Sequence, residues 1–129
     1  MILVDSSVWI AHLRGRNTVA TEKLRTLAAQ APLLIGDLIL LEILQGARDD
    51  LQAARIERDL RQFTVVSLLD DALAIRGARN YRKLRSLGIT IRKTADIIIG
   101  TFCIEHGHSL LHDDRDFAPM VKHLGLKVV

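Results

Sequence analysis

Short apolar runs alternate along this chain with longer segments in which apolar residues recur at helical spacing. Runs rich in Val, Leu and Ile are typical of buried strands, and they occur at residues 2–4, 33–35, 63–66, 109–111 and 127–129. Short buried strands separated by helices favour a parallel sheet that is covered on both faces. The sequence therefore predicts an α/β fold, a three-layer α/β/α sandwich with a central, mostly parallel sheet, in a single domain spanning residues 1–129.

The segments between these runs carry the boundary residues of helices. Ser6 or Ser7 can cap a first helix, and Asp37 can cap an apolar one. The other predicted helices cover about residues 18–30, 50–62, 71–87 and 94–106. Asp116 is expected to cap a final short helix, in which Pro119 falls in the first turn, where proline is tolerated.

Composition narrows the class of protein. With 49% hydrophobic and 26% charged residues the chain is not a disordered one, and with 4% aromatic residues its core must be aliphatic. The single cysteine, Cys103, excludes an internal disulfide, and we expect a reducing, cytoplasmic location. Asp5 follows a very short apolar start, which disfavours a signal peptide. Acids interrupt the most apolar stretches, so we expect no membrane span.

Several acids stand in apolar surroundings. Asp5 directly follows the first predicted strand, and Asp113 and Asp114 follow the fourth one almost directly. Because ligands bind at the carboxyl ends of parallel strands, these acids should meet at one functional rim. Glu42 and Asp96 lie in largely apolar helices, where an unpaired carboxylate costs several kcal/mol. Converging acids need a compensating cation, and an all-oxygen set favours Mg²⁺ or Mn²⁺ over zinc.

Each acid also has a simpler explanation. Asp5 could cap a helix, and Glu42 could pair with an arginine. Asp96 lies in the first turn of its helix, where a negative charge is favourable, while Asp114 and Asp116 could be turn or cap residues. The joint arrangement, with acids on strand ends and on apolar helices, favours the metal site over these separate explanations.

Four blocks carry a resemblance that covers the whole chain. They are MILVDSSVWI at residues 1–10, LEILQG at 41–46, RKTADIII at 92–99 and LLHDDRDF at 110–117. In this order they resemble the PIN-domain family and, within it, the VapC toxins of bacterial toxin–antitoxin pairs. The resemblance implies a PIN-like fold, RNA as the substrate and metal-dependent endoribonuclease activity in which water attacks phosphorus and leaves a 5′-phosphate.

The resemblance also implies which residues would act. The family's catalytic and metal-binding acids fall on Asp5, Glu42, Asp96 and Asp114. Asp116 matches a further metal-binding acid, and Ser6 matches a hydroxyl position near the water shell of the metal. The sequence departs from many members at His112 and Asp113, where Thr or Asn usually precedes the last acid. One or two Mg²⁺ or Mn²⁺ ions are the implied cofactor.

The charge balance fits a polynucleotide partner. The chain has 18 basic and 15 acidic side chains, so committing five acids to metal leaves about +8 on the rest. Arg92 and Lys93 precede Asp96 closely and are candidates for phosphate contacts. Arg82 shares a helical stripe with Arg76 and Arg79, which a merely solvated face would explain equally well.

The resemblance further implies a VapB-like antitoxin that inserts a basic side chain towards the acidic pocket. The apolar helix at 38–44 is a candidate homodimer interface. Trp9 and Cys103 are expected in the core, and a zinc site at His106 and His108 is disfavoured because no cysteine accompanies them.

Two other functions compete with the nuclease. One is a catalytically inactive PIN scaffold that binds RNA or protein, against which the complete set of acids argues. The other is a phosphatase with an aspartate nucleophile, a class that needs a second Asp two residues later, where this chain has Ser7.

Overall fold

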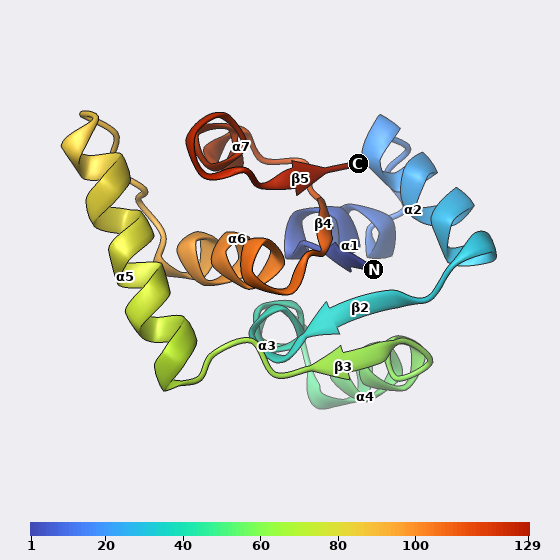
Figure 1. Cartoon of the computed structure of the whole chain (residues 1–129). Helices are drawn as coiled ribbons and strands as arrows, with labels where there is room; N and C mark the ends of the chain where they lie inside the picture. Colours follow the sequence, from blue (N-terminus) through green and yellow to red (C-terminus); the bar gives the residue numbers. More distant parts are fainter.

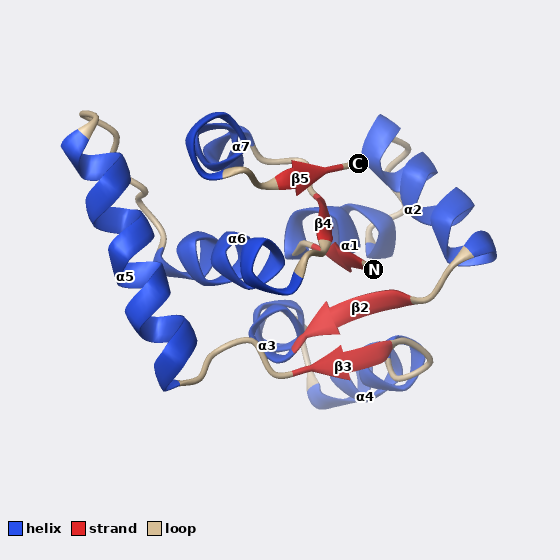
Figure 2. Cartoon of the chain, viewed as in Figure 1, coloured by secondary structure: helices blue, strands red, loops and turns tan.

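The computed structural model describes residues 1–129 and is built on a five-stranded parallel sheet (Figures 1 and 2). The strands are β1 (Ile2–Val4), β2 (Leu33–Gly36), β3 (Thr64–Val66), β4 (Ser109–Leu111) and β5 (Lys127–Val128). Their order is β3-β2-β1-β4-β5, and every neighbouring pair is parallel. The first strand of the chain therefore lies at the centre of the sheet.

Helices cover both faces of this sheet (Figure 1). They are α1 (Ser6–Leu13), α2 (Val19–Gln30), α3 (Asp37–Gln45), α4 (Asp50–Leu60), α5 (Asp71–Ser86), α6 (Thr94–His106) and α7 (Ala118–Leu124), with a 3₁₀ helix, η1 (Arg115–Phe117). Helix α1 packs on α2 and α3, and α3 packs on α4, whereas α5 packs on α6 and α7. These two groups lie on opposite faces of the sheet, which confirms the predicted three-layer α/β/α sandwich (Figure 1).

The core is aliphatic, as predicted. Leu3, Val4 and Leu110 on the central strands expose none of their surface. Trp9 is buried as well, and its ring packs against Phe63 with 4.9 Å between the ring centroids. Cys103 is fully buried, and burial raises the pKa of its thiol to about 12, so it remains protonated and unreactive. None of the helices combines the length and the apolar character needed to cross a bilayer.

Three predicted helix caps are wrong. Ser6 and Ser7 lie inside α1, and the cap of this helix is Asp5. Asp37 is the first residue of α3 rather than its cap, and its side chain accepts hydrogen bonds from the N–H groups of Leu38 and Leu68. Asp116 lies within η1, and the cap is Asp114, whose carboxylate accepts the N–H of Asp116. The turn after β4 is tighter than the sequence indicated, because it closes as a 3₁₀ helix before α7 begins.

Candidate functional site

Asp5 directly follows β1, the central strand of the sheet, and so lies at the carboxyl end of that strand. Its N–H donates to the carbonyl of Leu111 at 2.9 Å, which holds the end of β1 against the end of β4. Its side chain is 4% exposed, and Oδ2 accepts hydrogen bonds from the Ser7 N–H at 3.1 Å and the Ser7 hydroxyl at 2.6 Å. The helix-cap interpretation of Asp5 is therefore correct, and it leaves Oδ1 without a hydrogen bond.

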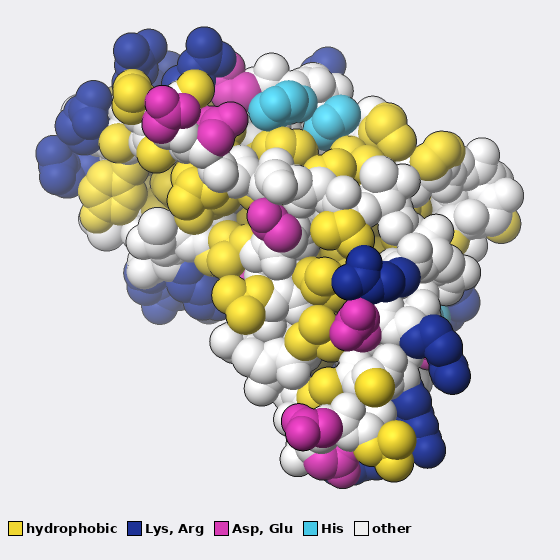
Figure 3. Space-filling view, turned by 90° about the horizontal axis from the view of Figure 1, so that it is seen from below, with side chains coloured by type: hydrophobic (Ala, Val, Ile, Leu, Met, Phe, Trp, Pro, Cys, Tyr) yellow, Lys and Arg dark blue, Asp and Glu magenta, His cyan; other side chains and the backbone are white.

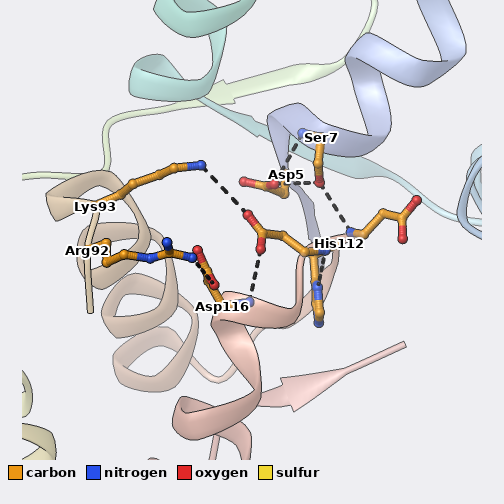
Figure 4. Close-up of polar contacts among 8 residues, drawn as sticks. Asp5, Ser7, Arg92, Lys93, His112 and Asp116 are labelled. Carbon is orange, nitrogen blue, oxygen red and sulfur yellow. Dashed lines mark hydrogen bonds and ion pairs between the residues drawn. The ribbon is translucent and has the colours of Figure 1, made fainter. Parts of the chain in front are cut away.

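The turn that follows β4 is fixed by side chains on both sides (Figure 4). The Ser7 hydroxyl accepts the N–H of Asp113 at 3.2 Å, so one serine connects this turn with Asp5. His112 Nδ1 accepts the N–H of Asp114 at 3.1 Å, and the His112 ring packs against Phe117. These contacts hold the backbone that carries Asp114 and Asp116.

Three carboxylates converge beside this turn. Oxygen atoms of Asp96, Asp114 and Asp116 lie within 4.8 Å of one another, and no other group of three candidate metal ligands occurs in the chain. Asp96 comes from the first turn of α6 and is 6% exposed, whereas Asp114 and Asp116 are partly exposed. Asp5 and Glu42 do not belong to this 4.8 Å group.

Glu42 and Asp96 carry buried oxygens without partners. Glu42 Oε1 and Asp96 Oδ2 are both buried and accept no hydrogen bond. Glu42 also forms no ion pair, so the alternative in which an arginine neutralises it is wrong. We call Asp5, Glu42 and Asp96 the buried side of the acidic pocket, and Asp114 and Asp116 its rim.

The pocket is electrostatically strained by like charges. Burial raises the pKa of Asp96 to about 6, and the negative charges of Asp5 and Asp114 add to the shift. Burial also raises the pKa of Glu42, again with a contribution from Asp5. The predicted acids from β1, α3, α6 and the turn after β4 thus act on one another, and a buried oxygen without a partner is the feature that a metal ion would satisfy.

Two basic side chains reach the rim from the segment before α6 (Figure 4). Arg92 lies with one guanidinium nitrogen 3.4 Å from Asp116 Oδ1, and Lys93 Nζ lies 3.9 Å from Asp114 Oδ2. Arg82 lies apart from them on α5 and lines a cavity of about 430 Å³ between α5 and α6. Lys and Arg side chains gather at the edge of the molecule formed by α5, on the left of Figure 3.

The sequence interpretation missed Ser7 and His112 as residues that hold the pocket. It singled out Ser6, whose hydroxyl forms no hydrogen bond in the structure, so the role of Ser6 stays a prediction. The sequence did contain a signal for Ser7, because a capping aspartate accepts a hydrogen bond from the residue two or three positions later in the chain. The signal for His112 was only its place in the turn.

The histidine pair has a structural explanation. His106 Nδ1 donates to the carbonyl of Phe102 at 3.0 Å, and its ring stacks on the Phe102 ring. The rings of His106 and His108 are nearly parallel at 6.0 Å, and no acid or thiol completes a metal site with them. All candidate metal chemistry in this chain is therefore carried by oxygen ligands, which select hard divalent cations.

Comparisons with known proteins match this chain to a known family. Residues 2–122 match the family model of the PIN domain. The chain is 34% identical over 120 residues to Ribonuclease VapC11 of Mycobacterium tuberculosis and to VapC ribonuclease Mb1587 of Mycobacterium bovis, covering 91% of this chain and 89% of each relative.

Solved structures show the same fold. VapBC2 from Rickettsia felis, bound to a promoter DNA fragment, superposes with a TM-score of 0.80 at 14% identity, over 100% of this chain and 98% of that one. A toxin–antitoxin complex from Klebsiella pneumoniae gives 0.74 at 24% identity, over 100% and 96%. PIN nucleases are metal-dependent, and in this chain Asp96, Asp114 and Asp116 lie close enough together to hold a metal ion. The chain belongs to the PIN domain family.

Proposed function

We propose that this protein is an endoribonuclease of the VapC type, the toxin of a VapBC-type toxin–antitoxin pair. The relatives that share 34% of its sequence are named as ribonucleases, and its structural neighbours are toxin–antitoxin complexes. The observation that carries the proposal is the pair of buried oxygens without partners, Glu42 Oε1 and Asp96 Oδ2, in a pocket of like charges. An inactive scaffold would have no reason to retain this strain.

The cofactor we propose is Mg²⁺ or Mn²⁺, held by oxygens of the acidic pocket. Asp5, Asp96, Asp114 and Asp116 would be ligands, with Glu42 completing the set. A divalent ion there would lower the pKa of a water molecule and offset negative charge on the oxygens around phosphorus. Glu42 or Asp96 would orient the attacking water, and Arg92 and Lys93 would bind RNA phosphates beside the acidic pocket.

The protein scaffold contributes position rather than chemistry. Ser7 holds Asp5 and the turn after β4 together, and His112 fixes the backbone of Asp114. Such partners of metal ligands are worth about 10- to 100-fold in affinity or activity. The pocket would thus be largely formed before the metal and the RNA arrive.

An antitoxin would inhibit this site by charge. A basic side chain inserted beside Asp96 would satisfy the same negative field as the metal, and an arginine can do so with two parallel hydrogen bonds. The homodimer expected through the helix at 38–44 stays a proposal. Leu41 on that helix is 58% exposed, as a contact with another molecule would require.

The decisive experiment is the substitution Asp5→Asn. It preserves the size of the side chain and removes the charge, so we expect RNA cleavage in Mg²⁺ to fall by about 100-fold or more and growth arrest to disappear. Asp50→Asn is the matched control, because Asp50 is exposed on α4 and should leave cleavage unchanged. Cleavage by Asp5→Asn at the unmodified rate would refute the site.

A Mn²⁺ titration separates this function from the inactive scaffold. The nuclease should bind Mn²⁺ with a measurable heat, and Asp5→Asn should weaken that binding. Absence of Mn²⁺ binding by the unmodified protein would favour a scaffold that works by occupancy alone.

A further inference from the structure

Lys93 is the positive charge most closely tied to the acidic pocket. Its Nζ lies 3.9 Å from Asp114 Oδ2, and its charge also acts on the buried side, where it lowers the raised pKa of Asp96 and of Glu42. One ammonium group therefore acts on three of the acids that we propose as metal ligands. In the protein without metal, it provides part of the charge that the metal would otherwise supply.

The contact between Lys93 and Asp114 uses the oxygen that the metal needs. Asp114 Oδ1 already accepts the N–H of Asp116 at 2.9 Å, so Oδ2 is the oxygen free to bind a cation. Lys93 lies at this same Oδ2. Arg92 is placed differently, because it contacts only Oδ1 of Asp116 and leaves Oδ2 of that carboxylate open.

Nothing else holds the Lys93 side chain in place. It stands at the N-cap position of α6, forms no capping hydrogen bond, and its side chain is 64% exposed. A lysine ammonium on a flexible four-carbon stem can leave one anion and reach another nearby at little cost. The phosphate of an RNA strand entering the pocket is such an anion.

We propose that Lys93 is the resident cation of the acidic pocket, that the metal displaces it from Asp114, and that the released ammonium then binds an RNA phosphate. This inference rests on the proposed function and assigns Lys93 a second role beyond phosphate contact. Metal and RNA then bind cooperatively, because each ligand favours the conformation in which Lys93 has left Asp114. Linkage requires that each ligand raises the affinity of the other by the same factor.

The substitution Lys93→Gln tests this exchange, with Mn²⁺ and a cleavage-resistant 2′-O-methyl oligoribonucleotide as probes. Removing the positive charge that competes with the divalent ion should tighten Mn²⁺ binding about tenfold at low salt, and less at high salt. The oligonucleotide should bind more weakly to the variant. In the unmodified protein it should tighten Mn²⁺ binding, and in Lys93→Gln this coupling should fall to the part that direct attraction between the metal and the phosphate supplies.

Two variants serve as controls for Lys93→Gln. Lys93→Arg keeps the charge and should retain most of the coupling. Lys23→Gln removes an exposed lysine of α2 that forms no ion pair, and it should change neither affinity. Circular dichroism melts establish that each variant is folded.

The outcomes are distinguishable. Lys93→Gln that binds Mn²⁺ no more tightly than the unmodified protein, or that retains full coupling, overturns the exchange while the nuclease proposal stands. An unmodified protein that binds no Mn²⁺ overturns both. Tighter Mn²⁺ binding together with weakened coupling supports the exchange.

Discussion

The carboxylates on the buried side of the acidic pocket and those on its rim lie in opposite surroundings. On the buried side, Asp96 is 6% exposed and one of its oxygens has no partner. On the rim, the side chains of Asp114 and Asp116 are 25% and 23% exposed, and each faces a basic residue. The carboxylates of the buried side have no basic side chain bonded to them, whereas each carboxylate of the rim faces a basic side chain that can move away.

The largest effect is expected for Asp96→Asn on the buried side, which should lower activity and raise stability. RNA cleavage should fall by about 100-fold or more, because a metal ligand and a charge are lost. The metal-free protein should become more stable by about 1–3 kcal/mol at neutral pH, since burying the ionised carboxylate is unfavourable. Chemical denaturation in EDTA and a cleavage assay in Mg²⁺ measure the two effects. A variant that loses both activity and stability would contradict the strained state of Asp96.

The same residue should leave a signature in the pH dependence of metal-free stability. The folded-state pKa of Asp96 is about 6, above its ordinary 3.8, so the folded protein keeps this proton at pH values where the unfolded chain has lost it. The contribution of Asp96 to stability therefore falls as pH rises from about 4 to about 6 and levels off above that. In Asp96→Asn this contribution should be absent, so that stability falls less steeply over the same pH range.

Ser7→Ala should have the next largest effect, because Ser7 joins the buried side to the turn that carries the rim. Losing its hydroxyl removes one of the two hydrogen bonds to Asp5 Oδ2 and leaves the Asp113 N–H without its acceptor, so Mn²⁺ affinity should fall about tenfold. Ser86→Ala is the matched control, because Ser86 is exposed at the end of α5 and its hydroxyl bonds only to the carbonyl of Lys83. Calorimetric titration with Mn²⁺ measures both. Equal losses in the two variants would show that the contacts of Ser7 with the pocket are not the cause.

Asp116→Asn on the rim should have the smallest effect. Asp116 is partly exposed, and its ion pair with Arg92 at 3.4 Å is of the kind that contributes at most about 1 kcal/mol. We expect Mn²⁺ affinity to fall about threefold to fivefold, which a titration at low salt resolves. If Asp116→Asn lost as much Mn²⁺ affinity as Asp96→Asn does, the distinction between the buried side and the rim would be wrong.

The sequence was sufficient to predict burial where the hydrophobic pattern determines the surroundings of a residue. Asp5 directly follows a strand of three apolar residues, and Glu42 lies in a helix with few polar neighbours, so their burial could be predicted. The parallel order of the strands then brought acids from distant segments to one edge of the sheet. Fold class and family followed from the same positions.

The sequence was insufficient where the outcome depends on side-chain direction. Two serines follow Asp5, and only the backbone geometry of the helix start decides that Ser7 bonds to it. The role of Asp114 as a cap depended on the 3₁₀ turn, which a polar DDRD segment does not specify. Which oxygen of Asp114 meets Lys93 is likewise a property of packing that no spacing encodes.

The central place of β1 has a consequence for synthesis of the chain. The backbone N–H of Asp5 bonds to Leu111, and Ser7 bonds to Asp113, which lies 106 residues later in the chain. A growing chain on the ribosome cannot complete the pocket before these later residues emerge from the exit tunnel. A nuclease whose pocket joins such distant segments is thus harmless to the ribosome and the message that produce it until the segment with Asp114 and Asp116 has been made and released.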